Sequence, residues 1–152
     1  MKWIRKKHGL TTIELIIVIA ITIILAGSAA PIYGGLQVQS QLNEASSGVV
    51  QALRAAREES TSGVNNSAHG VRFNTTNYSI YEGDSYTTRV QSEDRTFTLR
   101  SAVSLTTTLT NDEVNFSKGR GIPDNTGSVT LTHVTSGTRV IMINEFGVID
   151  EN

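Results

Sequence analysis

The feature that most constrains this chain is an apolar run close to its start. Residues 15–30 carry no charge and are mostly Ile, Leu, Val and Ala, and residues 10–13 extend the run past Glu14. A helix needs about 20 predominantly apolar residues to cross a bilayer. The sequence therefore predicts a transmembrane helical segment over residues 10–32.

Positive charge gathers before this run. Lys2, Arg5, Lys6 and Lys7 precede the first acidic residue, Glu14, and no comparable cluster follows the run. The positive-inside rule then keeps residues 1–9 in the cytoplasm and predicts a single-pass inner-membrane protein with its soluble part on the outer face. Of the 13 Lys and Arg residues, the four in this cluster leave 9 against 14 acidic residues in the rest of the chain. That net acidic balance argues against a general nucleic-acid-binding surface.

Glu14 is the residue that the simpler interpretations leave unexplained. A carboxylate in a membrane segment costs on the order of 2–3 kcal/mol at mid-depth, so a plain anchor would avoid it. An ordinary secretory signal is the other alternative, because Ser28, Ala29 and Ala30 are small enough for a cleavage site. Pro31 would directly follow that cut and is expected to obstruct a peptidase.

The segment around Glu14 resembles a known processing signature. The run His8-Gly9-Leu10-Thr11-Thr12-Ile13-Glu14-Leu15 is similar to the prepilin peptidase site of type IV pilin-like proteins, where glycine precedes the cut and glutamate is the fifth residue after it. Pro31 falls where many of these proteins also have a proline. Leu10 and Thr12 depart from the commoner phenylalanine or methionine and from the commoner leucine.

This resemblance implies a mechanism for the N-terminal segment. Residues 1–9 would be a leader that prepilin peptidase removes by cutting between Gly9 and Leu10, and the new amine of Leu10 would be N-methylated. Glu14 of one subunit would then pair with the amine of a neighbour, which offsets the cost of burying both charges. The implied partners are the peptidase, membrane lipid before assembly, and other pilin or pseudopilin subunits bound through the helix.

Beyond the apolar run, a second pattern predicts that the helix continues. Apolar residues recur at three- and four-residue steps, with polar residues between them, at Leu36, Leu42, Ala45, Val49, Leu53 and Ala56. We therefore expect one helix over residues 10–60 with a membrane-spanning half and an amphipathic half. Pro31 lacks an N–H and crowds the carbonyl of Gly27, so we expect a kink or local unwinding there. Polar and glycine residues over 61–67 should end the helix.

Residues 61–152 are predicted to form a small β-rich head. Short apolar runs broken by Asn, Gly, Asp and Thr indicate antiparallel strands at 70–73, 78–81, 87–91, 96–99, 104–109, 113–116, 128–134 and 139–144. Eight short strands favour two sheets packed against the helix. The predicted class is thus α+β, with a long N-terminal helix on a C-terminal antiparallel head.

The head is similar to the H-type pseudopilins of type II secretion and the FimT-like minor pilins, which share a fold. The segments that carry this resemblance are 53–59 at the end of the helix, 71–73, 114–116, 127–131 and 139–144, with Gly121 and Gly147. They imply a subunit of the GspH/FimT kind.

The residues of the head do not predict catalysis. His8 precedes the cut, while His69 and His133 stand among strand residues without a second strong ligand at metal spacing, so core or edge histidines are favoured. Cysteine is absent. An acidic tail lacks a regular oxygen-ligand loop and is expected to be a solvated end, at Glu145, Asp150 and Glu151. We predict no cofactor, no metal site and no enzyme.

Lys118 and Arg120 make the irregular stretch 117–127 basic. Some FimT-like minor pilins bind DNA through basic loops, so the resemblance attaches a weak DNA contact to these two residues. Two cations in an acidic head are few, and a plain connecting loop is the favoured interpretation.

Taken together, these patterns predict a structural, minor-type subunit of a type IV pilus or type II secretion pseudopilus, cleaved after Gly9 and assembled through its helix. The alternative that the residues leave open is a membrane-tethered module that never polymerises, such as an adhesin or DNA-uptake receptor head.

Overall fold

The computed structural model describes residues 11–151, and for residues 28–33 it describes the backbone alone. Contacts divide the chain into two compact units, Met1–Gln37 and Val38–Asn152. Helix α1 (Thr12–Ser62) supplies the described part of the first unit and the first element of the second. The second unit, called the head below, holds all the strands.

The part of α1 in the head is amphipathic, as predicted. Leu42, Val49, Leu53 and Ala56 are buried, while Leu36, before the head, is exposed. The helix ends at Ser62 because Gly63 adopts a left-handed backbone with φ 68°, which glycine tolerates without a steric cost. A short 3-10 turn, η1 (Val64–Asn66), follows, so the predicted end of the helix is confirmed.

The strands form two four-stranded antiparallel sheets, which confirms the α+β prediction. The first sheet has the order β3-β2-β1-β5 and the second β4-β6-β7-β8. Their bounds are β1 (His69–Phe73), β2 (Asn77–Glu82), β3 (Arg95–Thr98), β4 (Val103–Thr107), β5 (Glu113–Phe116), β6 (Gly127–His133), β7 (Thr138–Ile143) and β8 (Ile149–Glu151). Two further 3-10 turns are η2 (Gln91–Glu93) and η3 (Thr110–Asp112).

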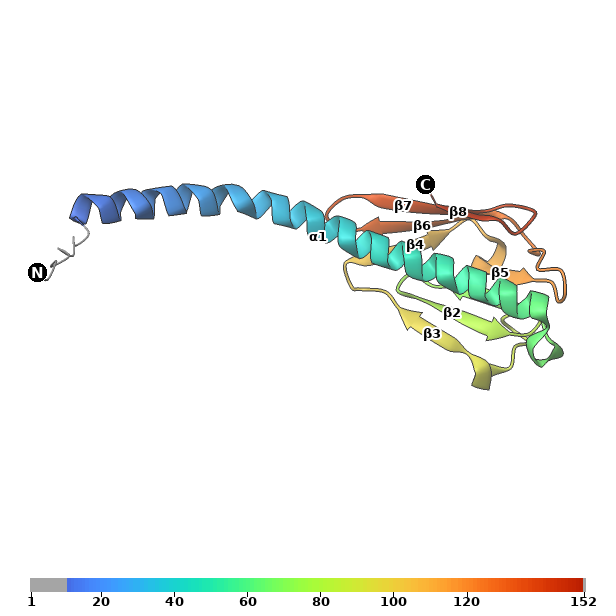
Figure 1. Cartoon of the computed structure of the whole chain (residues 1–152). Coiled ribbons are helices and arrows are strands. Elements are labelled where there is room, and N and C mark those ends of the chain that lie inside the picture. Colours follow the sequence, from blue (N-terminus) through green and yellow to red (C-terminus); the bar gives the residue numbers. More distant parts are fainter. Residues whose placement is uncertain (1–10, 152) are drawn as a thin grey trace, which may run out of the picture. The chain divides into compact units, whose positions relative to one another are not determined.

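One apolar core joins α1 to both sheets. Figure 1 shows the ribbon of α1 in the head beside the strands of both sheets. Val71 and Phe73 come from the first sheet, and Leu131 and Ile141 from the second. Polar contacts follow the same division: on the helix Glu59 bonds Arg95 of β3, and Asn43 bonds Arg139 of β7. Sequence patterning predicted two sheets, and the helix holds them in one head.

The predicted strand at residues 87–91 is wrong. Thr88 N donates to Ser85 O at 3.2 Å, which forms a turn, and Gln91 begins η2. Arg89 curls the segment further, because its guanidinium bonds Asp94 and the carbonyl of Tyr86 while lying 3.7 Å from the Tyr86 ring centre. In this segment the polar and cation–π contacts of Arg89 outweigh the local preference for a strand.

The last strand was not predicted. Asn144 Oδ1 accepts from the backbone N–H groups of Phe146 and Val148, and Gly147 has φ 71°, so the chain turns back on itself. Ile149 then pairs with Ile143 and is buried. The side chains of Glu145, Asp150 and Glu151 are exposed, as expected of this end, but two of them lie on a strand.

Candidate functional site on helix α1

The helix begins with a cap. Thr11 Oγ1 accepts a hydrogen bond from Glu14 N at 3.3 Å, and Thr11 O accepts from Leu15 N at 3.2 Å. Thr11 and Glu14 therefore stand at the two key positions of a capping box, where a threonine hydroxyl satisfies a free N–H of the first turn. Glu14 also lies at the positive end of the helix dipole. The cap was not recognised in the sequence, although Thr-x-x-Glu is its signature.

Apolar side chains cover this part of α1 and are exposed in the single chain. Exposure ranges from 50% to 71% for the large apolar residues between Ile13 and Leu25. The hydroxyl of Thr22 does not interrupt this surface, because it donates to Val18 O at 2.7 Å within the helix. A helix that is apolar all round needs an apolar environment, either lipid or other helices.

Among the described residues, no helix reaches both the length and the hydropathy of a membrane-spanning segment. The predicted span 10–32 includes residue 10 and the side chains of 28–32, which lie outside the described part of the chain.

The structure describes only some of the residues on which the other N-terminal predictions rest. Gly9, Leu10 and His8 lie outside the described residues, so cleavage and methylation stay predictions. The helix assignment is continuous through Pro31, whose side chain is not described, and a Cβ added to Gly27 would meet nothing within 4 Å. The kink at Gly27 and Pro31 likewise stays a prediction.

The head histidines are buried, and His69 has neighbours that the sequence did not reveal. His133 Nε2 lies 3.1 Å from Gln41 Oε1, which ties β6 to the helix. His69 Nε2 lies 3.9 Å from a carboxylate oxygen of both Glu59 and Glu82. Within residues 11–151 no group of three or more His, Asp or Glu side chains could hold a metal ion.

The loop with Lys118 and Arg120 packs on the end of the helix. Gly119 N donates to Ser60 O at 2.8 Å, and Lys118 Nζ bonds Asn66 Oδ1. Both side chains are exposed, so the DNA contact and the connecting loop stay alternative predictions for these two residues.

Arg57 is a residue that sequence reasoning missed. Its Nε donates to Gly121 O at 3.2 Å and its Nη2 to Phe146 O at 3.1 Å, so one helical side chain holds two distant loops. Gly121 and Gly147, which carry part of the resemblance to the H-type pseudopilins and FimT-like minor pilins, have positive φ beside these contacts.

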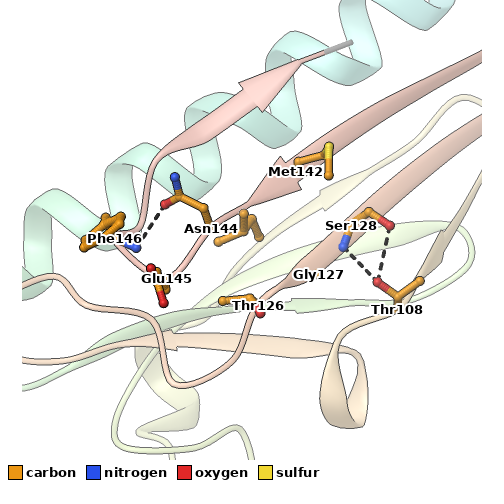
Figure 2. Close-up of a pocket in the computed structure, with 9 residues that line it drawn as sticks. Thr108, Thr126, Gly127, Ser128, Met142, Asn144, Glu145 and Phe146 are labelled. Atoms are coloured by element: carbon orange, nitrogen blue, oxygen red, sulfur yellow. Dashed lines mark hydrogen bonds between the residues drawn. The ribbon is translucent and has the colours of Figure 1, made fainter.

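A groove of about 620 Å³ lies at the end of the second sheet (Figure 2). Thr108, Ser128 and Met142 are among its lining residues, together with Phe146, which is 67% exposed. Glu145 is the one acidic side chain among its described lining residues, so the groove lacks the acid–base pair that general acid–base chemistry uses.

The chain has a type IV pilin-like fold. It is similar to the crystal structure of the type IV minor pilin FimU of Pseudomonas aeruginosa strain PAO1, with a TM-score of 0.53 and 17% identity over 76% of this chain and 88% of that chain. No family model matches the sequence. No curated protein matches it.

Proposed function

We propose that this chain is a non-enzymatic, minor-type structural subunit of a type IV pilus or of a type II secretion pseudopilus. The observation that carries the proposal is the exposed apolar surface of α1 before the head, joined to a pilin-like fold. In this proposal the chain enters the inner membrane through residues 10–32, loses residues 1–9 to prepilin peptidase, and passes into a filament of packed helices.

Glu14 is the proposed assembly carboxylate. It is the one acidic residue in the apolar stretch, and the Thr11 cap fixes its position in the first turn. Pairing with the N-terminal amine of a neighbouring subunit would satisfy both charges in a low-dielectric filament core. Leu10, once methylated, would supply that amine.

N-terminal mass spectrometry tests processing. The full chain is co-expressed with a prepilin peptidase, beside a Gly9→Ala control. We expect a mature chain that begins at Leu10, with added methyl mass, and no cleavage in the control. An intact Met1, or a cut near Ala30, would contradict the proposal.

Filament recruitment tests the role of Glu14. We expect Glu14→Ala to be cleaved normally and to stay in the membrane fraction, while the parent chain enters sheared filaments. Equal recovery of Glu14→Ala in filaments would remove its assigned role. Cleavage without any entry of the parent chain would favour the tethered binding module, for which the exposed groove beside Phe146 would be the binding surface.

A further inference from the structure

The turn between β7 and β8 holds an exposed aromatic ring in a fixed place. Asn144 N donates to Val148 O at 3.2 Å, and Gly147 N donates to Asn144 O at 2.9 Å, so the turn is closed on itself. Arg57 Nη2 donates to the carbonyl of Phe146 at 3.1 Å and anchors the same turn to the helix. The side chain of Phe146 is nevertheless 67% exposed. A large apolar ring on an anchored backbone is a preorganised contact surface.

Two polar side chains next to this ring have hydrogen-bonding groups to spare. Asn144 Oδ1 accepts from the backbone N–H groups of Phe146 and Val148. Because only the oxygen of an amide accepts, these two bonds fix its orientation and leave the Nδ2 donors for a ligand. The Glu145 carboxylate is exposed and has no partner among residues 11–151. Figure 2 shows Asn144, Glu145 and Phe146 following one another along the turn, so a donor, an acceptor and an aromatic face lie together.

The residues around the groove limit the kind of ligand that it takes. No Lys or Arg is among its described lining residues, which disfavours phosphate, sulfate and carboxylate groups. Phe146 is the one aromatic residue of this lining, whereas quaternary ammonium groups are bound by cages of several rings. Hydroxyl and amide groups in the lining disfavour a lipid chain, which would cover them without bonding them. A neutral, polar ligand is the class that remains.

The outer face of the second sheet continues this uncharged surface. Val129, Leu131 and Ile141 point into the core, so the residues that alternate with them lie on the outer face. Strand pairing places these outward residues in three rows across β4, β6 and β7, which are Ser104–Thr132–Thr138, Thr106–Thr130–Val140 and Thr108–Ser128–Met142. The third row also lines the groove. A soluble surface is usually about 25–35% charged, so a block of uncharged, mostly hydroxyl-bearing residues favours a neutral partner.

We propose that the groove and this outer face bind a neutral polysaccharide. A sugar ring presents C–H groups on one face, and these stack against the negative face of an aromatic ring such as Phe146. Each sugar hydroxyl both donates and accepts, so neighbouring hydroxyls suit the Asn144 amide and the Glu145 carboxylate. The groove, at about 620 Å³, has the size of a small-ligand site, and the three rows extend it for a longer chain.

Such a site deepens the proposed function and rests on it for one point, which is that the head lies outside the cytoplasm. It applies equally to a head in a filament and to a tethered head. The groove is open and has no buried charge, so we expect it to bind a single oligosaccharide weakly. An insoluble polymer should hold the chain better, because its repeats raise the effective concentration of sites.

Retention on insoluble polymers tests the ligand class. The full chain, in a detergent without a sugar head group, is mixed with cellulose, chitin or cross-linked dextran, and the bound fraction is measured. Carboxymethyl cellulose is the matched anionic polymer. We expect retention on at least one of the neutral polymers. Retention on none of them, or on carboxymethyl cellulose alone, would overturn the inference.

Aromatic variants test the stacking contact. Phe146→Ala should lower retention several-fold, whereas Phe146→Tyr keeps the ring and should bind as the parent chain does. Phe97→Ala removes an exposed ring from the first sheet, so it is the matched control and should leave retention unchanged. Equal retention of Phe146→Ala and the parent chain would refute the site.

A charge placed on the outer face tests whether the polymer extends over the sheet. Thr130→Arg should lower retention, because a long cation blocks the middle row. Gln51→Arg adds the same charge on the exposed side of α1 and should have no effect. Circular dichroism in urea confirms that both variants keep the stability of the parent head. Unchanged retention of Thr130→Arg would refute the contact with the sheet face.

The same preparations separate this site from the proposed function, because they are also scored for cleavage after Gly9 and for entry into sheared filaments. A chain that is cleaved and assembled but binds no neutral polymer refutes the polysaccharide site and leaves the subunit role standing. A chain that binds through Phe146 but is neither cleaved nor assembled refutes the subunit role and supports the site.

Discussion

At the scale of single residues, close approaches decide which substitutions the head can accept. Gly70 in β1 is covered by the ring and hydroxyl of Tyr81, and a Cβ there would also lie 2.6 Å from Val114 O. Tyr81 is fully buried, and Asn115 Nδ2 bonds both its hydroxyl and the carbonyl of Gly83. The buried ring of Tyr81 and its hydrogen bond to Asn115 therefore fit only if residue 70 has no side chain.

We expect Gly70→Ala to lower the free energy of unfolding by about 1–3 kcal/mol, because the added methyl overpacks the site against backbone. Urea unfolding followed by circular dichroism measures it. Thr106→Ala, an exposed position in β4, should change stability little. Equal midpoints for the two variants would show that the sheet relaxes around the new methyl.

Burial also predicts how the head responds to alkali. Burial raises the pKa of the Tyr81 phenol, because the phenolate would lose its hydration. The folded state thus holds this proton more tightly than the unfolded chain, whose tyrosine pKa is about 10. The stability from the neutral phenol is fully present below that pH and is lost as pH rises toward the folded pKa.

We therefore expect the urea midpoint to fall as pH is raised from about 9 to about 11, and Tyr81→Phe to weaken that fall. Burial raises the pKa of Tyr78 as well, so the double variant Tyr78→Phe/Tyr81→Phe should flatten the profile further. A profile that keeps the slope of the parent chain in both variants would assign the alkaline sensitivity to other groups.

At the scale of elements, the helix end is where distant segments meet. Arg57 joins α1 to the loop after β5 and to the turn between β7 and β8. Ser60 Oγ accepts from His69 N at 2.8 Å, which fixes the start of β1 on the same end. The last two turns of the helix thus position three segments of the head.

Arg57→Ala should destabilise the head by about 1–3 kcal/mol, because two loop carbonyls lose a charged donor. Arg54→Ala is the matched control, since Arg54 is exposed on the same helix and has no polar partner among the described residues. Amide exchange should rise at Gly121 and Gly147 in the first variant and not in the second. Unchanged exchange at both glycines would show that the loops hold their turns without Arg57.

The strand predictions were correct where the alternation of apolar and polar residues is enough to show which side chains are buried. Seven of the eight predicted strands coincide with observed ones to within a few residues, because alternating apolar side chains give a local signal. The segment 87–91 failed because its conformation follows from contacts of Arg89 with Tyr86 and Asp94. Strand β8 was missed because its three residues are too short to show an alternation.

At the scale of the whole molecule, the two compact units differ in how their apolar side chains are buried. The core of the head is built from residues after 37, beginning with Val38 and Leu42. The described side chains of the first unit, at 11–27 and 34–37, contribute none of the buried core residues, and its large apolar side chains there are exposed. The head should therefore fold without the first unit.

We expect a chain that starts at Val38 to unfold cooperatively in urea, with a midpoint close to that of the head in the full chain held in detergent. Circular dichroism at both helix and tyrosine wavelengths would check that the two transitions coincide. A shortened chain without a cooperative transition would mean that residues before Val38 stabilise the head.

The sequence by itself determined the apolar run, the isolated Glu14, the glycine-glutamate spacing and the amphipathic continuation of the helix. Each is a pattern between near neighbours, so it is visible before folding. Only the tertiary structure decided that His69 lies near both Glu59 and Glu82, that Arg57 holds two loops, and that β3 forms an outer edge of the first sheet. These depend on strand order and on contacts between residues far apart in the chain, which local propensity and periodicity do not encode.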